Sequence, residues 1–200
     1  MRVNKGLMIA ATFDPTKRTS LITVADMCRK IEENSISLPL YQRDISWTLQ
    51  KCIDLLNYQL WGKAPVSPIS INVINTVDSA VPQVSFIDRE IISTIERGQY
   101  SVVDGQQRLT TNYKAYCNHD DFRNIVLDLG KGEFTEVRDS IRSNQIPVGI
   151  LLNKEDTKLF EYTKAKSALG SADVLSVLLQ VRSKMRNYNY RNAVAAENIY

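Results

Sequence analysis

The hydrophobic positions in the first part of the chain follow the period of α-helices. Apolar side chains at positions 24, 27, 28 and 31 recur at intervals of three and four residues, and Thr23 precedes them as a capping residue. A second set of apolar positions begins after Thr48 and is closed by Gly62. Pro39 lies between the two sets and does not fit a helix interior, so residues 36–40 are expected to be extended. The pattern predicts two helices joined through a short strand.

Strand spacing dominates the middle of the chain. The apolar residues at positions 69, 71 and 73 alternate with polar ones, which is typical of a half-buried strand. Tyr100, Val102 and Val103 predict a short buried strand that leads into helical spacing over residues 106–116. The other expected elements are a strand at 84–87, a helix or hairpin connection at 88–97, a hairpin of residues 125–129 and 134–137, and an extended apolar run at 146–152.

The pattern becomes helical after Asn153. Residues 155–167 have the spacing of a helix, Gly170 interrupts it, and Ser171 is placed to cap a long helix. We therefore expect an α+β fold with two parts. Residues 1–152 are expected to form a mixed sheet with flanking helices, and residues 153–200 a C-terminal helical extension.

Composition limits the class of protein without indicating a function. The 200 residues suffice for one domain, and contents of 44% hydrophobic and 24% charged residues are ordinary for a globular protein. No stretch reaches the length of about 18 apolar residues that spans a membrane, so the chain is interpreted as cytoplasmic. A net charge of +3 is compatible with nucleic acid but does not require it. The three cysteines have no C-x-x-C spacing and are interpreted as core thiols.

The most informative segment is the strand-to-helix junction at Asp104-Gly105. A strand that turns directly into a helix leaves unpaired backbone N–H groups at the helix start, which favour an anion. Arg108 can hold a phosphate in a bidentate manner, Asp104 can bind a metal or orient a water, and the amides of Gln106 and Gln107 can position a nucleophile. The alternative is an ordinary turn whose aspartate caps the helix and whose polar residues face solvent.

A second polar cluster, Tyr41-Gln42-Arg43, follows the extended segment that contains Pro39. Arg43 can bind a phosphate, and Gln42 can hydrogen-bond a base, a ribose or a nucleophilic water. The alternative is a surface turn in which Arg43 pairs with Asp44 or another acid. We expect this cluster to converge with the Asp104–Arg108 segment in one cleft.

The C-terminal region carries a run of basic residues with tyrosines between them. Such a run suits a nucleic-acid backbone, and tyrosines at positions 188 and 190 can stack on bases. The alternative is a solvated helix face with cations that complement the helix dipole. The candidate DNA-binding residues are Arg182, Lys184, Arg186 and Arg191.

The two polar clusters resemble motifs of the DGQQR family, the GmrS-like domains of the GmrSD, SspE and BrxU types of restriction system. The first motif is Asp104-Gly105-Gln106-Gln107-Arg108, followed by Leu109-Thr110-Thr111. The second, upstream, is Ile36-Ser37-Leu38-Pro39-Leu40-Tyr41-Gln42-Arg43, followed by Trp47. The resemblance covers roughly residues 20–155 and is fairly specific, because both motifs occur in the right order.

The resemblance implies a ParB/sulfiredoxin-like fold and a phosphate-processing domain, often NTP-hydrolysing, in defence against phage or foreign DNA. Together with the chemistry above it implies Mg²⁺ as a cofactor held by Asp104. The residues implied to be catalytic are Asp104, Gln107 and Arg108. The residues implied to bind nucleotide or phosphate are Tyr41, Gln42, Arg43, Gly105, Gln106 and Thr110.

Relatives of this family often carry an HNH nuclease module, which needs more than one histidine. His119 is the only histidine here, so a nuclease partner would be a separate subunit or a further C-terminal domain. The leading hypothesis is NTP hydrolysis with DNA as regulator or second substrate. The rivals are a non-catalytic DNA-binding sensor that regulates a nuclease, and a ParB-like DNA nickase. No Walker A string is present, so any nucleotide must bind through the family's own pocket.

Overall fold

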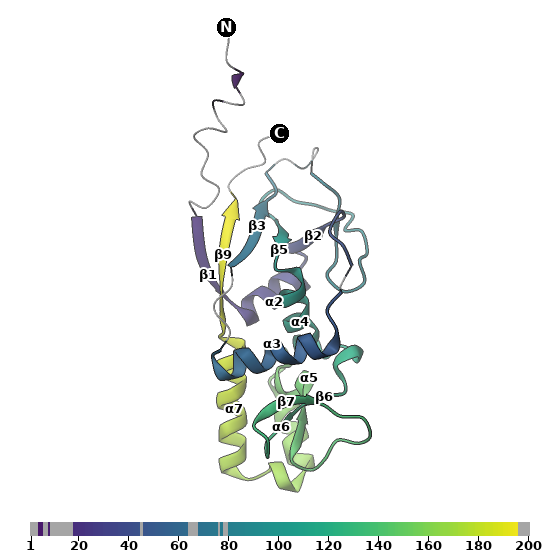
Figure 1. Cartoon of the computed structure of the whole chain (residues 1–200), viewed down its shortest axis with the longest axis vertical. Helices are drawn as coiled ribbons and strands as arrows, with labels where there is room; N and C mark the ends of the chain where they lie inside the picture. Colours follow the sequence, from purple (N-terminus) through teal and green to yellow (C-terminus); the bar gives the residue numbers. More distant parts are fainter. Residues whose placement is uncertain are drawn as a thin grey trace.

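The fold is seen in a computed structural model (Figure 1), which describes residues 4, 5, 8, 18–44, 46–63, 68–75, 77 and 80–195. Two sheets with flanking helices confirm the expected α+β class. In Figure 1 the larger sheet occupies the upper half of the molecule and the smaller sheet the lower half, with helix α3 (Leu49–Trp61) crossing between them. The likeness to ParB and sulfiredoxin stays a prediction.

The larger sheet has six strands and mixed direction. Two of its neighbouring pairs, β2 with β5 and β3 with β9, are parallel, and the others are antiparallel. The parallel pairing of β2 and β5 sends both chains out of the sheet at the same edge. In spatial order the strands are β1 (Arg18–Thr23), β9 (Asn189–Ala195), β3 (Pro68–Val73), β5 (Tyr100–Asp104), β2 (Ile36–Pro39) and β4 (Gln83–Val84).

The helices begin where the sequence places capping residues. The side chains of Thr23, Thr48 and Ser171 each accept a backbone N–H at the start of a helix, as expected. The smaller sheet contains β7 (Glu133–Glu136), β6 (Ile125–Asp128) and β8 (Gln145–Pro147) in that spatial order. The other helical segments are α2 (Val24–Glu32), α4 (Gln106–Tyr116), η1 (Asp120–Phe122), α5 (Val148–Leu151), α6 (Thr157–Ala165), η2 (Ser167–Leu169) and α7 (Ala172–Arg186).

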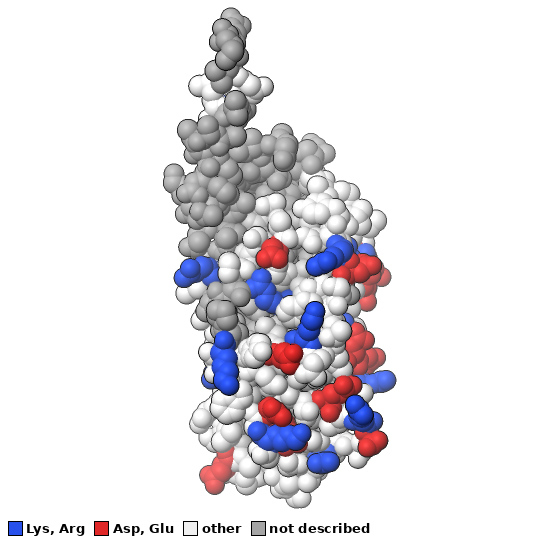
Figure 2. Space-filling model, viewed as in Figure 1, with Lys and Arg blue, Asp and Glu red and all other residues white. Residues whose placement is uncertain are grey.

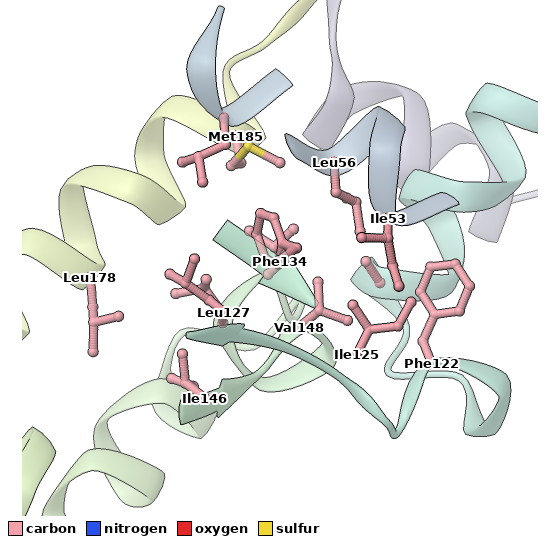
Figure 3. Close-up of a cluster of buried hydrophobic side chains, with 14 of the residues drawn as sticks. Ile53, Leu56, Phe122, Ile125, Leu127, Phe134, Ile146, Val148, Leu178 and Met185 are labelled. Carbon is pink, nitrogen blue, oxygen red and sulfur yellow. The ribbon is translucent and has the colours of Figure 1, made fainter. Parts of the chain in front are cut away.

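The buried side chains form two clusters, one for each sheet. One cluster joins α2 and α4 to the larger sheet. The other, shown in part in Figure 3, packs α3 and α7 against the smaller sheet around Phe134. Helix α4 contributes to both, because Leu109 belongs to the first cluster and Ala115 to the second. The helix that follows Asp104-Gly105 is therefore fixed between the two cores.

The run at 146–152 differs from expectation, and the 88–97 segment follows one of its two expected alternatives. The run at 146–152 is not extended throughout, because β8 ends at Pro147 and α5 follows. A continuous apolar run fits a buried strand and a buried helix equally well, so its spacing does not distinguish the two. Residues 88–97 contain no helix: Ile91 bridges back to Val84, and Ser85 N–H bonds to Glu90 O at 2.9 Å, as in a hairpin connection.

The C-terminal part contains a strand besides the expected helices. Strand β9 inserts between β1 and β3, antiparallel to the first and parallel to the second. It places Tyr190, which is 1% exposed, in the core of the larger sheet. Its partners lie more than 100 residues away in sequence, so no local pattern identifies it. The division of the chain at residue 152 stays a prediction.

Candidate functional site

The two polar clusters meet because they follow neighbouring parallel strands. Ile36 pairs with Tyr100 in the parallel register of β2 and β5, so the loops after both strands leave at one edge of the sheet. These loops enclose a pocket of about 280 Å³, which we call the DGQQR pocket. Its lining residues are Gln42, Arg43, Trp47, Val103, Asp104, Gly105, Gln106, Gln107 and Arg108.

Two glutamine side chains hold the walls of the DGQQR pocket together. Gln42 Nε2 donates to the carbonyl of Val103 at 2.5 Å, which ties the first loop to β5. Gln107 Oε1 accepts the backbone N–H groups of Ser46 and Trp47, both at 3.2 Å. Because its amide oxygen is engaged with the backbone, the geometry gives Gln107 the role of fixing this segment against α4.

The two arginines of the pocket differ in how much protein they contact. Arg108 Nη2 lies 3.6 Å from Asp104 Oδ2 and donates to the carbonyl of Pro68 at 3.1 Å. Arg43 is exposed, and in the described part of the chain no hydrogen bond or ion pair holds its guanidinium. The Asp44 carboxylate pairs instead with Arg89 Nε at 3.5 Å. The Arg43 charge therefore faces the pocket without a protein counter-ion among the described residues.

Arg89, which no sequence motif indicates, supports the turn that carries Arg43. Its Nη2 donates to the carbonyls of Leu40, at 3.4 Å, and Gln42. With the Asp44 contact, this side chain holds both ends of the turn that presents Arg43. It lies in the irregular 85–98 segment with a positive φ of 58°, and no motif or spacing marks it.

The start of α4 supplies further hydrogen-bond donors to the pocket. No side chain caps this helix, and its first backbone bond runs from Leu109 N–H to Gly105 O at 3.1 Å. The preceding N–H groups thus point out of the helix, at its positive end. The Gln106 side chain is 5% exposed, and its Nε2 has no partner among the described residues. Donors and positive charge outnumber the single carboxylate, Asp104, so the pocket suits an anion with several oxygens.

Gly105 allows the turn from β5 into α4. Its φ of +97° is strained for other residues, and an added Cβ would lie 3.1 Å from Ile69 Cγ1. We expect Gly105→Ala to lower the free energy of unfolding by about 2–3 kcal/mol. Gly98→Ala is the matched control, because Gly98 has a φ of +93° and open space around it. Urea unfolding of both variants separates the cost of the positive φ from the cost of the Ile69 contact. Equal losses in the free energy of unfolding would show that the Ile69 contact adds no cost.

Two predicted binding residues lie outside the DGQQR pocket. Tyr41 is 64% exposed and lines a separate depression beside Pro39. Thr110 is 1% exposed and lines a second pocket on the next turn of α4. The structure therefore brings together seven of the predicted catalytic and binding residues: Gln42, Arg43, Asp104, Gly105, Gln106, Gln107 and Arg108.

The candidate DNA-binding residues do not form one surface. Arg182 is 5% exposed, and its guanidinium donates to the carbonyls of Leu151 and Asn153 and to Asp156, each at 2.6 Å. Arg186 also donates to Asn153 O, at 2.8 Å, and lies over the Tyr116 ring. The remaining two, Lys184 on α7 and Arg191 on β9, are exposed.

Tyr190 is not available for stacking on a base. Its hydroxyl accepts hydrogen bonds from Gln59 Nε2 at 2.8 Å and Asn112 Nδ2 at 2.9 Å, inside the core. Burial raises the pKa of this phenol above its usual range.

On the face shown in Figure 2, basic and acidic side chains are intermixed. A large basic surface is therefore not seen on this face.

The described residues contain no group of three or more His, Cys, Asp or Glu side chains that could hold a metal ion. Mg²⁺ often binds through one or two carboxylates together with substrate phosphates, and the exposed Asp104 carboxylate fits that mode.

Burial raises the pKa of the Cys28, Cys52 and Cys117 thiols, so they are poor nucleophiles. Among the described residues, no helix is both long and apolar enough to cross a membrane.

Comparison with known proteins identifies the family. A search of the curated proteins finds no match. Against protein families, residues 24–195 match the description "GmrSD restriction endonuclease, N-terminal domain". The match includes both loops of the DGQQR pocket and strand β9, and it covers most of the chain. The chain therefore belongs to the family of GmrSD restriction endonuclease N-terminal domains and is a module of a restriction system.

Proposed function

We propose that the DGQQR pocket binds the phosphates of a nucleoside triphosphate and hydrolyses its terminal phosphoanhydride bond, with DNA as regulator or second substrate. The observation that carries this proposal is the convergence of Arg43, Arg108 and the α4 N-terminus on one pocket. Phosphoryl transfer needs charge neutralisation and positioning above all, and these groups supply both.

Each group has a defined task in this proposal. Arg43 and Arg108 neutralise negative charge on the phosphate oxygens, and the N–H groups at the start of α4 donate to the same oxygens. The Gln106 amide, which is buried and unpartnered within the described structure, donates to the ligand. Gln107 keeps Ser46 and Trp47 in place and does not itself reach the reacting atoms.

Asp104 is the carboxylate that orients the attacking water. The water oxygen bonds to the terminal phosphorus and the water gives up a proton to solvent, the bond to the bridging oxygen breaks, and nucleoside diphosphate and phosphate leave. Asp104 would also hold Mg²⁺ together with the phosphates, and the ion would neutralise further phosphate charge.

A non-catalytic role is the second candidate, in which the pocket holds a DNA phosphate and a nuclease partner cuts. The lone carboxylate among the residues that line the pocket favours it. A DNA nickase would need more acidic ligands than the described pocket offers. The family description places the domain in a restriction endonuclease, so we propose DNA and an HNH-type nuclease subunit or domain as partners.

The test is phosphate release from nucleoside triphosphates, with Mg²⁺, in the presence and absence of DNA. The proposal expects turnover that changes when DNA is added. If DNA binds with a steep salt dependence while no triphosphate is hydrolysed under any condition, the sensor role replaces it.

Arg89 should affect ligand binding through the turn that it holds. We expect Arg89→Ala to weaken the binding of inorganic tripolyphosphate about tenfold, because Arg43 loses its fixed position. Arg97→Ala, an exposed arginine in the same irregular segment, is the control and should bind as the unmodified chain does. Isothermal titration calorimetry measures both; equal affinities would remove Arg89 from the site.

A further inference from the structure

A second pocket adjoins the DGQQR pocket at Trp47. Its volume of about 310 Å³ lies at the lower end of the range for small-molecule sites. Trp47 lines both pockets, so they share a wall. The residues around this Trp47–Phe122 pocket are Trp47, Leu49, Cys52, Thr110, Thr111, Lys114, Asp121 and Phe122.

Both pockets lie along the same stripe of α4. Gln106 and Thr110 are four residues apart, and Lys114 follows four residues later, so the three share one face of the helix. The step between successive positions is about 6 Å along the helix axis. A ligand that extends from the helix start along this face can therefore contact both pockets.

The chemistry of the Trp47–Phe122 pocket differs from that of its neighbour. Its walls combine the rings of Trp47 and Phe122 and the side chain of Leu49 with four polar side chains, those of Thr110, Thr111, Lys114 and Asp121. Lys114 Nζ pairs with the Asp121 carboxylate at the pocket, and this contact lowers the pKa of Asp121. The pair presents a donor beside an acceptor, which matches the polar edge of a heterocyclic base. Thr110 Oγ1 is buried and has no partner among the described residues.

We propose that the Trp47–Phe122 pocket holds the nucleobase of the nucleotide whose phosphates occupy the DGQQR pocket. This inference rests on the proposed function. The base packs against Trp47, its edge faces Lys114 and Asp121, and its sugar crosses the shared wall. Base stacking on an aromatic side chain makes a nucleoside triphosphate bind about tenfold or more tightly than tripolyphosphate, which lacks a base.

The experiment compares the two ligands with Trp47 as reporter. Trp61 is 59% exposed, so Trp61→Phe leaves Trp47 as the sole tryptophan at little structural cost. In this background, nucleoside triphosphate should quench the Trp47 fluorescence and bind about tenfold or more tightly than tripolyphosphate. Tripolyphosphate should bind without the same quenching. Its affinity is measured by calorimetry.

Variants of the polar pair test the base contact. Asp121→Asn and Lys114→Gln should each weaken the triphosphate about three- to tenfold and leave tripolyphosphate affinity unchanged. Lys154→Gln is the control, because it removes an ion pair with Glu32 that lines neither pocket. It should change neither affinity.

The outcomes separate the two claims. Equal affinities for triphosphate and tripolyphosphate, with no quenching, would overturn the base pocket and leave the phosphate pocket intact. No binding of either ligand would overturn the proposed function as well. Quenching by a single-stranded oligonucleotide but not by nucleoside triphosphate would show that the base comes from DNA, and would overturn the inference as stated.

Discussion

Arg43→Ala is expected to lower the rate of NTP hydrolysis by about 10²- to 10³-fold. The Arg43 guanidinium is exposed at the DGQQR pocket and has no protein counter-ion in the described structure, so its charge is available to the phosphates. Removing one such charged donor from a phosphoryl-transfer site costs a factor of this size. Steady-state phosphate release at saturating nucleotide measures the loss.

Stability measurements make this result specific. Because no described contact depends on the Arg43 side chain, the free energy of unfolding should stay within about 0.5 kcal/mol of the parent chain. Arg123→Ala, another exposed arginine that does not line the pocket, should retain full activity. Unchanged hydrolysis in Arg43→Ala, or equal losses in both variants, would contradict a phosphate-binding role for Arg43.

Arg182→Ala is expected to lower the free energy of unfolding by about 3 kcal/mol. The buried guanidinium donates to two backbone carbonyls and to Asp156, and alanine leaves these acceptors without their donor. Lysine cannot reproduce this planar set of donors, so Arg182→Lys should recover only part of the loss. Urea unfolding followed by circular dichroism measures the three proteins.

Lys184→Ala is the matched control on the same helix. Lys184 is exposed, so its replacement should change stability by no more than about 0.5 kcal/mol. If Arg182→Ala is as stable as the parent and binds DNA more weakly, the structural role is wrong, and Arg182 contacts DNA as the sequence predicts.

The sequence predicts the site better than it predicts the sheet. The strand at 100–104, the glycine turn and α4 follow from local patterns, because each depends on residues within one turn or strand. The joining of this segment to Gln42-Arg43 depends on the parallel pairing of β2 with β5, which is not encoded locally. The two motifs occur in the order typical of the DGQQR family, which indicates that both segments matter. Only the parallel register of β2 and β5 shows why they meet.

Contacts that act over long sequence distances are what the sequence could not supply. Arg89 reaches the turn at residues 40–44 from more than 40 positions away, and β9 pairs with β1 across the whole chain. Side-chain amides are equally ambiguous. The Gln107 side chain is of a type that can position a nucleophile. Its amide oxygen nevertheless accepts two backbone N–H groups of the opposite loop. Arg182 has the charge of a DNA contact and is buried against carbonyls.

A crystal structure with a non-hydrolysable nucleoside triphosphate and Mg²⁺ tests the central claim most directly. We predict that the terminal phosphates lie between the guanidinium groups of Arg43 and Arg108, within hydrogen-bond distance of the N–H groups at the start of α4. A nucleotide bound elsewhere on the chain, with both arginines directed away from its phosphates, would contradict the account.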